Sequence, residues 1–170
     1  MFNDVRPLKG NEFQFIDYIN RLEKTYKGKN KDWIKPIQRD WKIYPYWCLS
    51  FVDDKIIAFS AIQKHYMPVD TVRVLTRTWI DESFRSVEIS KRQYTPTANM
   101  LKNQLECSEI LHFKKAIITL EPKRSHHGIV YAAKRFNDRI GSNFIPQKDK
   151  IKTWPTAKPD QYQWYASMNL

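Results

Sequence analysis

Three β-type segments follow one another between residues 46 and 80, and this run limits the possible folds more than any other feature of the sequence. The first two segments, YWCLSFV and KIIAFSAIQ, are separated only by Asp53 and Asp54, which predicts a β-hairpin. The third, TVRVLTRTWI, predicts a strand whose side chains alternate strictly between two faces, so that Arg73, Leu75 and Arg77 are expected on one face. The chain is therefore expected to contain an antiparallel meander.

Helical patterns lie on both sides of this meander. Asn11 can cap a helix that extends to about Tyr26, and a short second helix is expected after Asp32. Beyond the meander, Thr95 and Pro96 predict the cap and the first residue of a long helix, because proline lacks the N–H that a first helical position leaves unbonded.

The second half of the chain alternates between strand and helix. KKAIITLE is a continuous apolar segment, typical of a strand that is covered on both faces. Residues 125–140 follow as a predicted helix that ends before Gly141, and QWYASMNL is expected to be a last strand. A strand, a helix and a strand after a hairpin predict one α/β domain over residues 1–170, with a sheet that is antiparallel first and parallel in the middle.

The composition narrows the possible classes of protein. Hydrophobic residues make up 42% of the chain, which is too high for disorder, and no segment approaches the ~18 consecutive apolar residues of a membrane span. The N-terminal residues lack the apolar core of a signal peptide. Cys48 and Cys107 lie far apart, so neither a disulfide framework nor a zinc knuckle is expected. These features favour a cytoplasmic protein without a membrane partner.

The charge points toward an anionic partner. The chain carries 29 Lys and Arg against 18 Asp and Glu, a net charge of +11. Such an excess attracts nucleic acid, anionic cofactors or acidic proteins. Six Trp and nine Tyr lie among the basic residues. They would suit base stacking, but packing in a small aromatic core is the favoured interpretation.

The order of the predicted elements resembles the GNAT family of acyl-CoA N-acyltransferases from about residue 11 to residue 170. VDDKIIAFSAIQ is similar to the hairpin of the family, TVRVLTRTWIDESFRS to its central strand, and KKAIITLEPKRSHHGIVYAAKRFN to the next strand and helix. The ending DQYQWYASMNL is also similar to GNAT-like proteins encoded by tailed bacteriophages. The resemblance implies a mixed, mostly antiparallel sheet with a splayed parallel pair in its centre and helices on both faces.

The resemblance also implies a cofactor and a substrate. An acyl-CoA, most of all acetyl-CoA, would insert its pantetheine arm between the two splayed strands and bind to the backbone of Thr78, Trp79 and Ile80. An amine substrate would attack the thioester directly, with one group to remove its proton and another to protonate the leaving thiolate.

The segment that would bind the pyrophosphate of this cofactor lacks the glycines of the family motif R/Q-x-x-G-x-G/A. No glycine lies between Gly28 and Gly128, which also excludes glycine-rich P-loop and dinucleotide motifs. Lys91, Arg92 and the helix start at Thr95 can supply charge and N–H donors instead. A basic turn that only contacts solvent is the alternative.

Three residues are candidates for proton transfer. In the family a tyrosine that acts as general acid lies about seven residues after the polar residue that opens the last helix. Counted from Ser125, Tyr131 falls one position short of that spacing. Glu82 at the end of the central strand and His126 at the start of the last helix are the other two. Each has an alternative as an ordinary surface or core residue.

A metal site is not expected at His126 and His127, because adjacent helical residues point ~100° apart and no further ligand is suitably spaced. The leading prediction is thus an acyl-CoA-dependent N-acyltransferase without a metal. The alternative is a protein of the same fold that no longer uses the cofactor and binds nucleic acid or an acidic protein through its basic surface. The missing glycines and the displaced tyrosine favour that alternative.

Overall fold

The computed structural model describes the backbone of residues 4–26, 31–66, 69–85 and 87–170, and their side chains except those of 31–32 and 87–95. In this part of the chain seven strands form one sheet in the order β1-β2-β3-β4-β5-β7-β6. The strands are β1 (Asp4–Pro7), β2 (Tyr46–Val52), β3 (Lys55–Lys64), β4 (Thr71–Ile80), β5 (Lys115–Leu120), β6 (Ile145–Ile151) and β7 (Gln163–Asn169). The α-helices are α1 (Glu12–Thr25), α2 (Lys31–Asp40), α3 (Val87–Ile110) and α4 (His126–Ile140). Three short 3₁₀ turns are η1 (Trp41–Ile43), η2 (Glu82–Phe84) and η3 (Pro159–Gln161).

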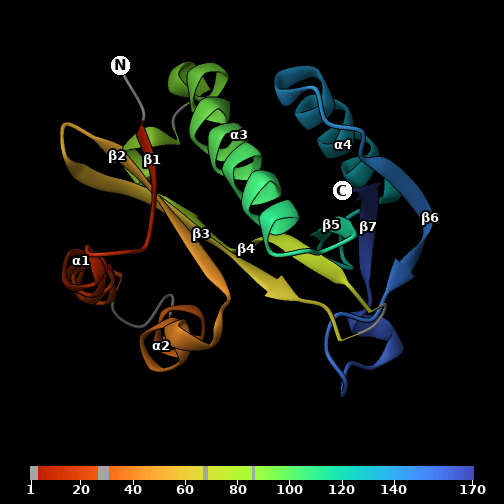
Figure 1. Cartoon of the computed structure of the whole chain (residues 1–170), viewed down its shortest axis with the longest axis horizontal. Helices are drawn as coiled ribbons and strands as arrows, with labels where there is room; N and C mark the ends of the chain where they lie inside the picture. Colours follow the sequence, from red (N-terminus) through yellow and green to blue (C-terminus); the bar gives the residue numbers. More distant parts are fainter. Residues whose placement is uncertain (1–3, 27–30, 67–68, 86) are drawn as a thin grey trace.

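The predicted fold class is confirmed. Among the described strands β4 and β5 pair in parallel, and every other neighbouring pair is antiparallel. The predicted hairpin joins β2 to β3, and both of its turn residues, Asp53 and Asp54, have positive φ angles of 51° and 58°. This turn geometry matches the right-handed twist of two antiparallel strands. Figure 1 shows α3 and α4 on one face of the sheet and α1 and α2 on the other.

Two strands are absent from the sequence prediction. β1 has only four residues, and β6, with the sequence IPQKDKI, is polar, lies at the edge of the sheet and has no fully buried residue. A short strand and a polar edge strand show no apolar alternation, because they do not bury one face against the core. Their place is decided by pairing with β2 and β7.

The predicted start of the long helix at Thr95 and Pro96 is wrong. Helix α3 begins at Val87 and includes Pro96 in its interior. The residues before Pro96, VEISKRQY, contain no glycine or proline that would prevent a helix, and the glutamate, lysine, arginine and glutamine among them are good helix formers. They continue the helix toward its N-terminus, although the interior proline removes one hydrogen bond of the helical ladder.

The face of the sheet under α1 and α2 carries an aromatic core. Phe59 of β3 lies fully buried at its centre, with ring centroids at 5.5 Å from Phe15 of α1, 5.8 Å from Trp47 of β2 and 6.0 Å from Trp33 of α2. The favoured interpretation of the aromatic residues as core residues is confirmed for this group. These contacts attach both helices to the face of the sheet that carries the site described below.

Substituting Phe59→Ala is expected to lower the free energy of unfolding by about 3–5 kcal/mol, because it removes a buried ring and leaves a cavity among other rings. Urea unfolding followed by tryptophan fluorescence measures this change. The matched control is Phe13→Ala on α1, whose side chain is 89% exposed. We expect that variant to change stability by less than about 0.5 kcal/mol. Equal effects of the two variants would contradict the position of the core.

Candidate functional site

Strands β4 and β5 diverge in the middle of the sheet. They pair only from Thr71 with Lys115 to Arg73 with Ile117, although β4 continues to Ile80 and β5 to Leu120. Beyond Arg73, the edge of β4 that faces β5 has no strand partner. The sheet therefore opens as a wedge between two parallel strands, as the sequence prediction expected.

Two irregularities in β4 accompany this divergence. Where β3 advances by two residues, from Phe59 to Ala61 and again from Ala61 to Gln63, β4 advances by three. Each extra residue forms a β-bulge, and one residue in each bulge has a positive φ angle: Leu75 at 54° and Arg77 at 52°. Residues other than glycine rarely adopt this backbone conformation. Each of the two therefore costs about 1–3 kcal/mol in folding free energy, which the surrounding contacts must offset.

The bulges correct the predicted strict alternation of β4. Leu75 packs in the core beside Val72 and Val74 under α3 and α4, whereas it was expected on the same face as Arg73. Thr76 lines a cavity together with Arg73 and Arg77, on the opposite face. The two arginines still line one cavity, as predicted, although Arg77 lies within the second bulge.

A buried glutamine of α3 holds the bulged strand. Gln104 is fully buried, and its side-chain oxygen accepts a hydrogen bond of 2.8 Å from the backbone N–H of Leu75. Its side-chain nitrogen donates to the Ser60 hydroxyl at 2.9 Å, and that hydroxyl lies 2.8 Å from the Thr78 hydroxyl. This network replaces a ladder hydrogen bond that β4 cannot make at the bulge.

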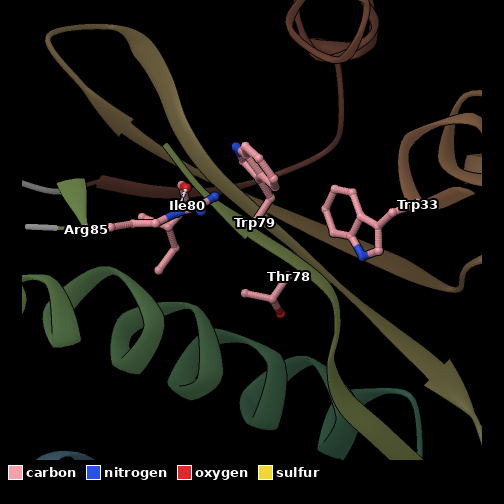
Figure 2. Close-up of a pocket in the computed structure, with 5 residues that line it drawn as sticks. All are labelled: Trp33, Thr78, Trp79, Ile80 and Arg85. Atoms are coloured by element: carbon pink, nitrogen blue, oxygen red, sulfur yellow. Dashed lines mark hydrogen bonds between the residues drawn. The ribbon is translucent and has the colours of Figure 1, made fainter. Parts of the chain in front are cut away.

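The first cavity, here named the strand-end cavity, has a volume of about 430 Å³ and is lined by Trp33, Thr78, Trp79, Ile80 and Arg85. Figure 2 shows Thr78 pointing toward α3 and Trp79 pointing to the opposite side of β4. The Arg85 guanidinium lies 4.2 Å from the Trp79 ring centre, and its Nε donates to the Ile80 carbonyl.

The backbone of β4 alternates in direction along this cavity. Asp81 donates its N–H to the Ile57 carbonyl of β3 at 2.7 Å, and Trp79 pairs with Phe59 two residues earlier. Backbone groups of successive strand residues point to opposite sides, so both groups of Ile80 and the carbonyl of Thr78 point away from β3, toward the wedge. The bond from Arg85 to the Ile80 carbonyl agrees with this direction. Thr78 and Ile80 are thus the residues that offer backbone groups to a ligand in the wedge.

The second cavity, here named the arginine cavity, has a volume of about 400 Å³. Three of its residues belong to β4: Arg73, Thr76 and Arg77. The others come from α2, from the segment before β2, from β3, and from the chain between β6 and β7: Trp33, Tyr44, Gln63, Thr153, Trp154 and Gln163. Trp33 lines both cavities, so they meet at this side chain.

Only some of the residues predicted to bind the cofactor can be placed at the site. Thr78, Trp79 and Ile80 line the strand-end cavity. The side chains of Lys91, Arg92 and Thr95 lie outside the described residues, so their role with a pyrophosphate stays a prediction. Because α3 begins at Val87, the unbonded N–H groups of its start lie before these residues and not at Thr95.

The three candidates for proton transfer do not come together. Glu82 accepts a hydrogen bond of 2.9 Å from the Tyr26 hydroxyl, which raises the pKa of that tyrosine. The His126 ring bonds to the Gln147 carbonyl of β6 at 2.8 Å. Tyr131 is 59% exposed on α4, and its hydroxyl accepts from Arg135 one turn later at 2.7 Å. Of the three, only Glu82 lies within two residues of a strand-end cavity residue, and the catalytic roles stay predictions.

Metal-ligating residues do not gather in the described part of the chain: no three His, Cys, Asp or Glu side chains are arranged to hold an ion there. Among the described residues, no helix has the length and apolarity needed to cross a membrane. Cys48 and Cys107 are free thiols, and burial raises the pKa of both.

Sequence comparison and structural comparison give different results for this chain. No protein-family model and no curated protein sequence matches it. Among solved structures it is similar to an acetyltransferase of the GNAT family from Streptococcus pneumoniae, with a TM-score of 0.55 and 10% identity over 99% of this chain and 100% of that one. It is also similar to the PaiA N-acetyltransferase from Thermoplasma acidophilum in complex with coenzyme A, with a TM-score of 0.56 and 12% identity over the full length of both chains.

A third similar structure is the GNAT superfamily phosphinothricin acetyltransferase from Sinorhizobium meliloti in complex with AcCoA. Its TM-score is 0.55 and its identity 11%, over 100% of this chain and 89% of that one. At such low identities the likeness is one of fold. The chain has the fold of the GNAT acetyltransferases, as the order of elements in the sequence predicted.

The sequence prediction did not identify Trp33, Arg85 or the arginine cavity as parts of a site. Arg73 and Arg77 were placed on one face of a strand, but nothing in the sequence indicates that Gln63 and Gln163 lie beside them. These residues come from segments far apart in the chain, so only the sheet order β3-β4-β5-β7 brings them together.

Replacing Gln104 by methionine tests the network that holds the bulges. Gln104→Met keeps a similar volume but leaves the Leu75 N–H without its acceptor, and we expect a loss of about 1–3 kcal/mol in the free energy of unfolding. Chemical denaturation measures it. The control is Lys102→Met, an exposed position on the same helix, which is expected to change stability by less than about 0.5 kcal/mol. A neutral Gln104→Met variant would contradict the role of the glutamine.

Proposed function

We propose that this protein is an acyl-CoA-dependent N-acyltransferase that transfers an acetyl group to an amine. The observation that carries the proposal is the wedge between β4 and β5, whose pairing ends at Arg73 and Ile117 while β4 continues for seven residues. Two similar structures are complexes with coenzyme A and with AcCoA. The shared fold and the open strand edge together support a site for the same cofactor here.

In this proposal the pantetheine arm lies in the wedge and bonds to the backbone of β4. Ile80 and Thr78 supply the groups that point away from β3, and Trp79 forms the apolar wall of the strand-end cavity. Arg85 would exchange its bond with the Ile80 carbonyl for the phosphates of the cofactor, which carry the opposite charge. Lys91, Arg92 and Thr95 stay candidates for the pyrophosphate.

The chemistry is a direct transfer. The amine nitrogen bonds to the carbonyl carbon of the thioester, the C–S bond breaks, and the proton lost by the amine balances the proton gained by the CoA thiolate. Glu82, His126 and Tyr131 are the proposed candidates for moving these protons. Nothing in the arrangement of the described residues favours the alternative of a nucleic-acid or acidic-protein partner, which stays a prediction from the net charge.

Binding of acetyl-CoA, measured by isothermal titration calorimetry, tests the proposal. Wild-type protein is expected to bind acetyl-CoA, and Ile80→Pro is expected to bind it about 5- to 30-fold more weakly, because proline removes the backbone N–H that points into the wedge. This N–H is not part of the ladder with β3, so the substitution breaks no hydrogen bond between the two strands.

Ile80→Val is the matched control, since it keeps the backbone N–H and removes one methylene group. It is expected to bind acetyl-CoA as the wild type does. Far-UV circular dichroism of both variants establishes that they are folded. Absence of a calorimetric signal and of a thermal shift with saturating acetyl-CoA in the wild type would overturn the proposed function.

A further inference from the structure

The arginine cavity contains two positive charges that form no ion pair with a carboxylate among the described residues. Arg73 donates from Nε to the Thr119 hydroxyl at 2.9 Å and from Nη2 to the side-chain oxygen of Gln163 at 3.1 Å. Arg77 donates from Nε to the Tyr44 hydroxyl at 3.0 Å. All three acceptors are neutral, and the lining residues that the structure describes include no Asp or Glu. Within the described residues, neither arginine takes part in a salt bridge.

Burial and mutual repulsion make the two charges of Arg73 and Arg77 energetically unfavourable. Burial, and then the charge of Arg77, lowers the pKa of Arg73 to about 10, so Arg73 stays protonated at neutral pH. The charge of Arg77 also helps to lower the pKa of Asp40, but the main cause there is Arg39, which binds that carboxylate from Nε at 2.9 Å and from Nη2 at 2.7 Å. Two neighbouring cations without an anion of their own are a favourable place for a ligand anion.

A third observation concerns unused polar groups in the same cavity. The Thr153 side chain is 7% exposed, and its hydroxyl has no hydrogen-bond partner among the residues that the structure describes. Gln63 and Thr76 add further polar side chains to the lining. A guanidinium carries five N–H donors, so Arg73 and Arg77 have donors beyond the bonds described above. Buried polar groups are normally paired, and a polar ligand would pair these.

The position of the cavity relates it to the wedge. Arg73 belongs to the last pair between β4 and β5, and its partner Thr119 lies two residues beyond that pair on β5. The guanidinium of Arg73 thus spans the point where the two strands diverge. The face of the sheet is the one that α1 and α2 cover, since the lining includes Trp33 and Tyr44.

From these observations we infer that the arginine cavity binds an oxyanion of the acceptor, so that the substrate is a small amine with a carboxylate or phosphate group. The inference rests on the proposed function. Planar guanidinium groups match carboxylate and phosphate oxygens in pairs of hydrogen bonds. A volume of about 400 Å³ suits a small molecule. An oxyanion held by Arg73 and Arg77 would leave the amine near the point of strand divergence, where the acyl group of the cofactor would end.

The inference is tested with pairs of amines that differ mainly in the negative charge. The twenty L-amino acids are compared with their amides, and phosphoethanolamine is compared with ethanolamine, as acceptors for acetyl-CoA. Release of the free CoA thiol measures kcat/KM. For at least one pair, we expect the charged member to be preferred by about tenfold to a hundredfold, the effect of a hydrogen bond to a charged group. The amino acids and phosphoethanolamine identify which oxyanion the cavity prefers.

Two variants assign the preference to the cavity. Arg77→Gln is expected to raise KM for the charged acceptor by about tenfold or more and to change KM for its neutral partner little. Arg21→Gln on α1 removes the same charge from an exposed ion pair with Asp17, and it is expected to leave both values unchanged. Thermal shifts with the preferred amine, without acetyl-CoA, give a reading of binding that does not need catalysis.

The outcomes separate this inference from the proposed function. If neutral amines are acetylated as fast as their charged partners, the inference is overturned and the proposed transferase activity stands. The same holds if Arg77→Gln weakens the binding of acetyl-CoA itself in calorimetry. The absence of both turnover and a thermal shift with every charged amine would also overturn the inference. A thermal shift that depends on Arg77, in a protein that does not bind acetyl-CoA, would support the oxyanion site and overturn the transferase.

Discussion

The divergence of β4 from β5 is the constraint on which the rest of the site depends. A strand inside a sheet normally satisfies its backbone groups on both edges, and β4 gives up one edge beyond Arg73. Two bulges with positive φ at Leu75 and Arg77 accompany this change, and the buried side chain of Gln104 binds the backbone N–H at the first of them. The open edge, the strand-end cavity and the arginine cavity all lie along this irregular strand.

The two faces of β4 supply different chemistry because of the bulges. The face toward α3 carries Leu75 in the core and the Thr78 hydroxyl in the network of Gln104. The face toward α1 and α2 carries Arg73, Thr76 and Arg77. An ordinary alternating strand would have placed Leu75 between the two arginines. A cofactor in the wedge and an acceptor beside the arginines would therefore approach the same strand from different directions.

Much of the fold could be predicted from the sequence, because periodicity and turn residues act locally. The hairpin at Asp53 and Asp54, the helix that ends before Gly141 and the parallel pair in the centre are all confirmed. The start of α3 was predicted wrongly, because Pro96 is a strong local signal that the rest of the helix overrides. The edge strands β1 and β6 were absent from the prediction, because edge pairing has little effect on composition.

The sequence by itself determined the class of fold and identified Thr78, Trp79 and Ile80 as residues of interest, because both depend on the order of segments along the chain. The tertiary structure decided that Arg73, Arg77, Gln163 and Thr153 line one cavity, and that Tyr131 lies exposed on α4. The cavity joins residues up to 130 positions apart in the chain, from Trp33 to Gln163. Neighbours so distant are fixed by strand order and by the bulges of β4, and neither leaves a local pattern in the sequence.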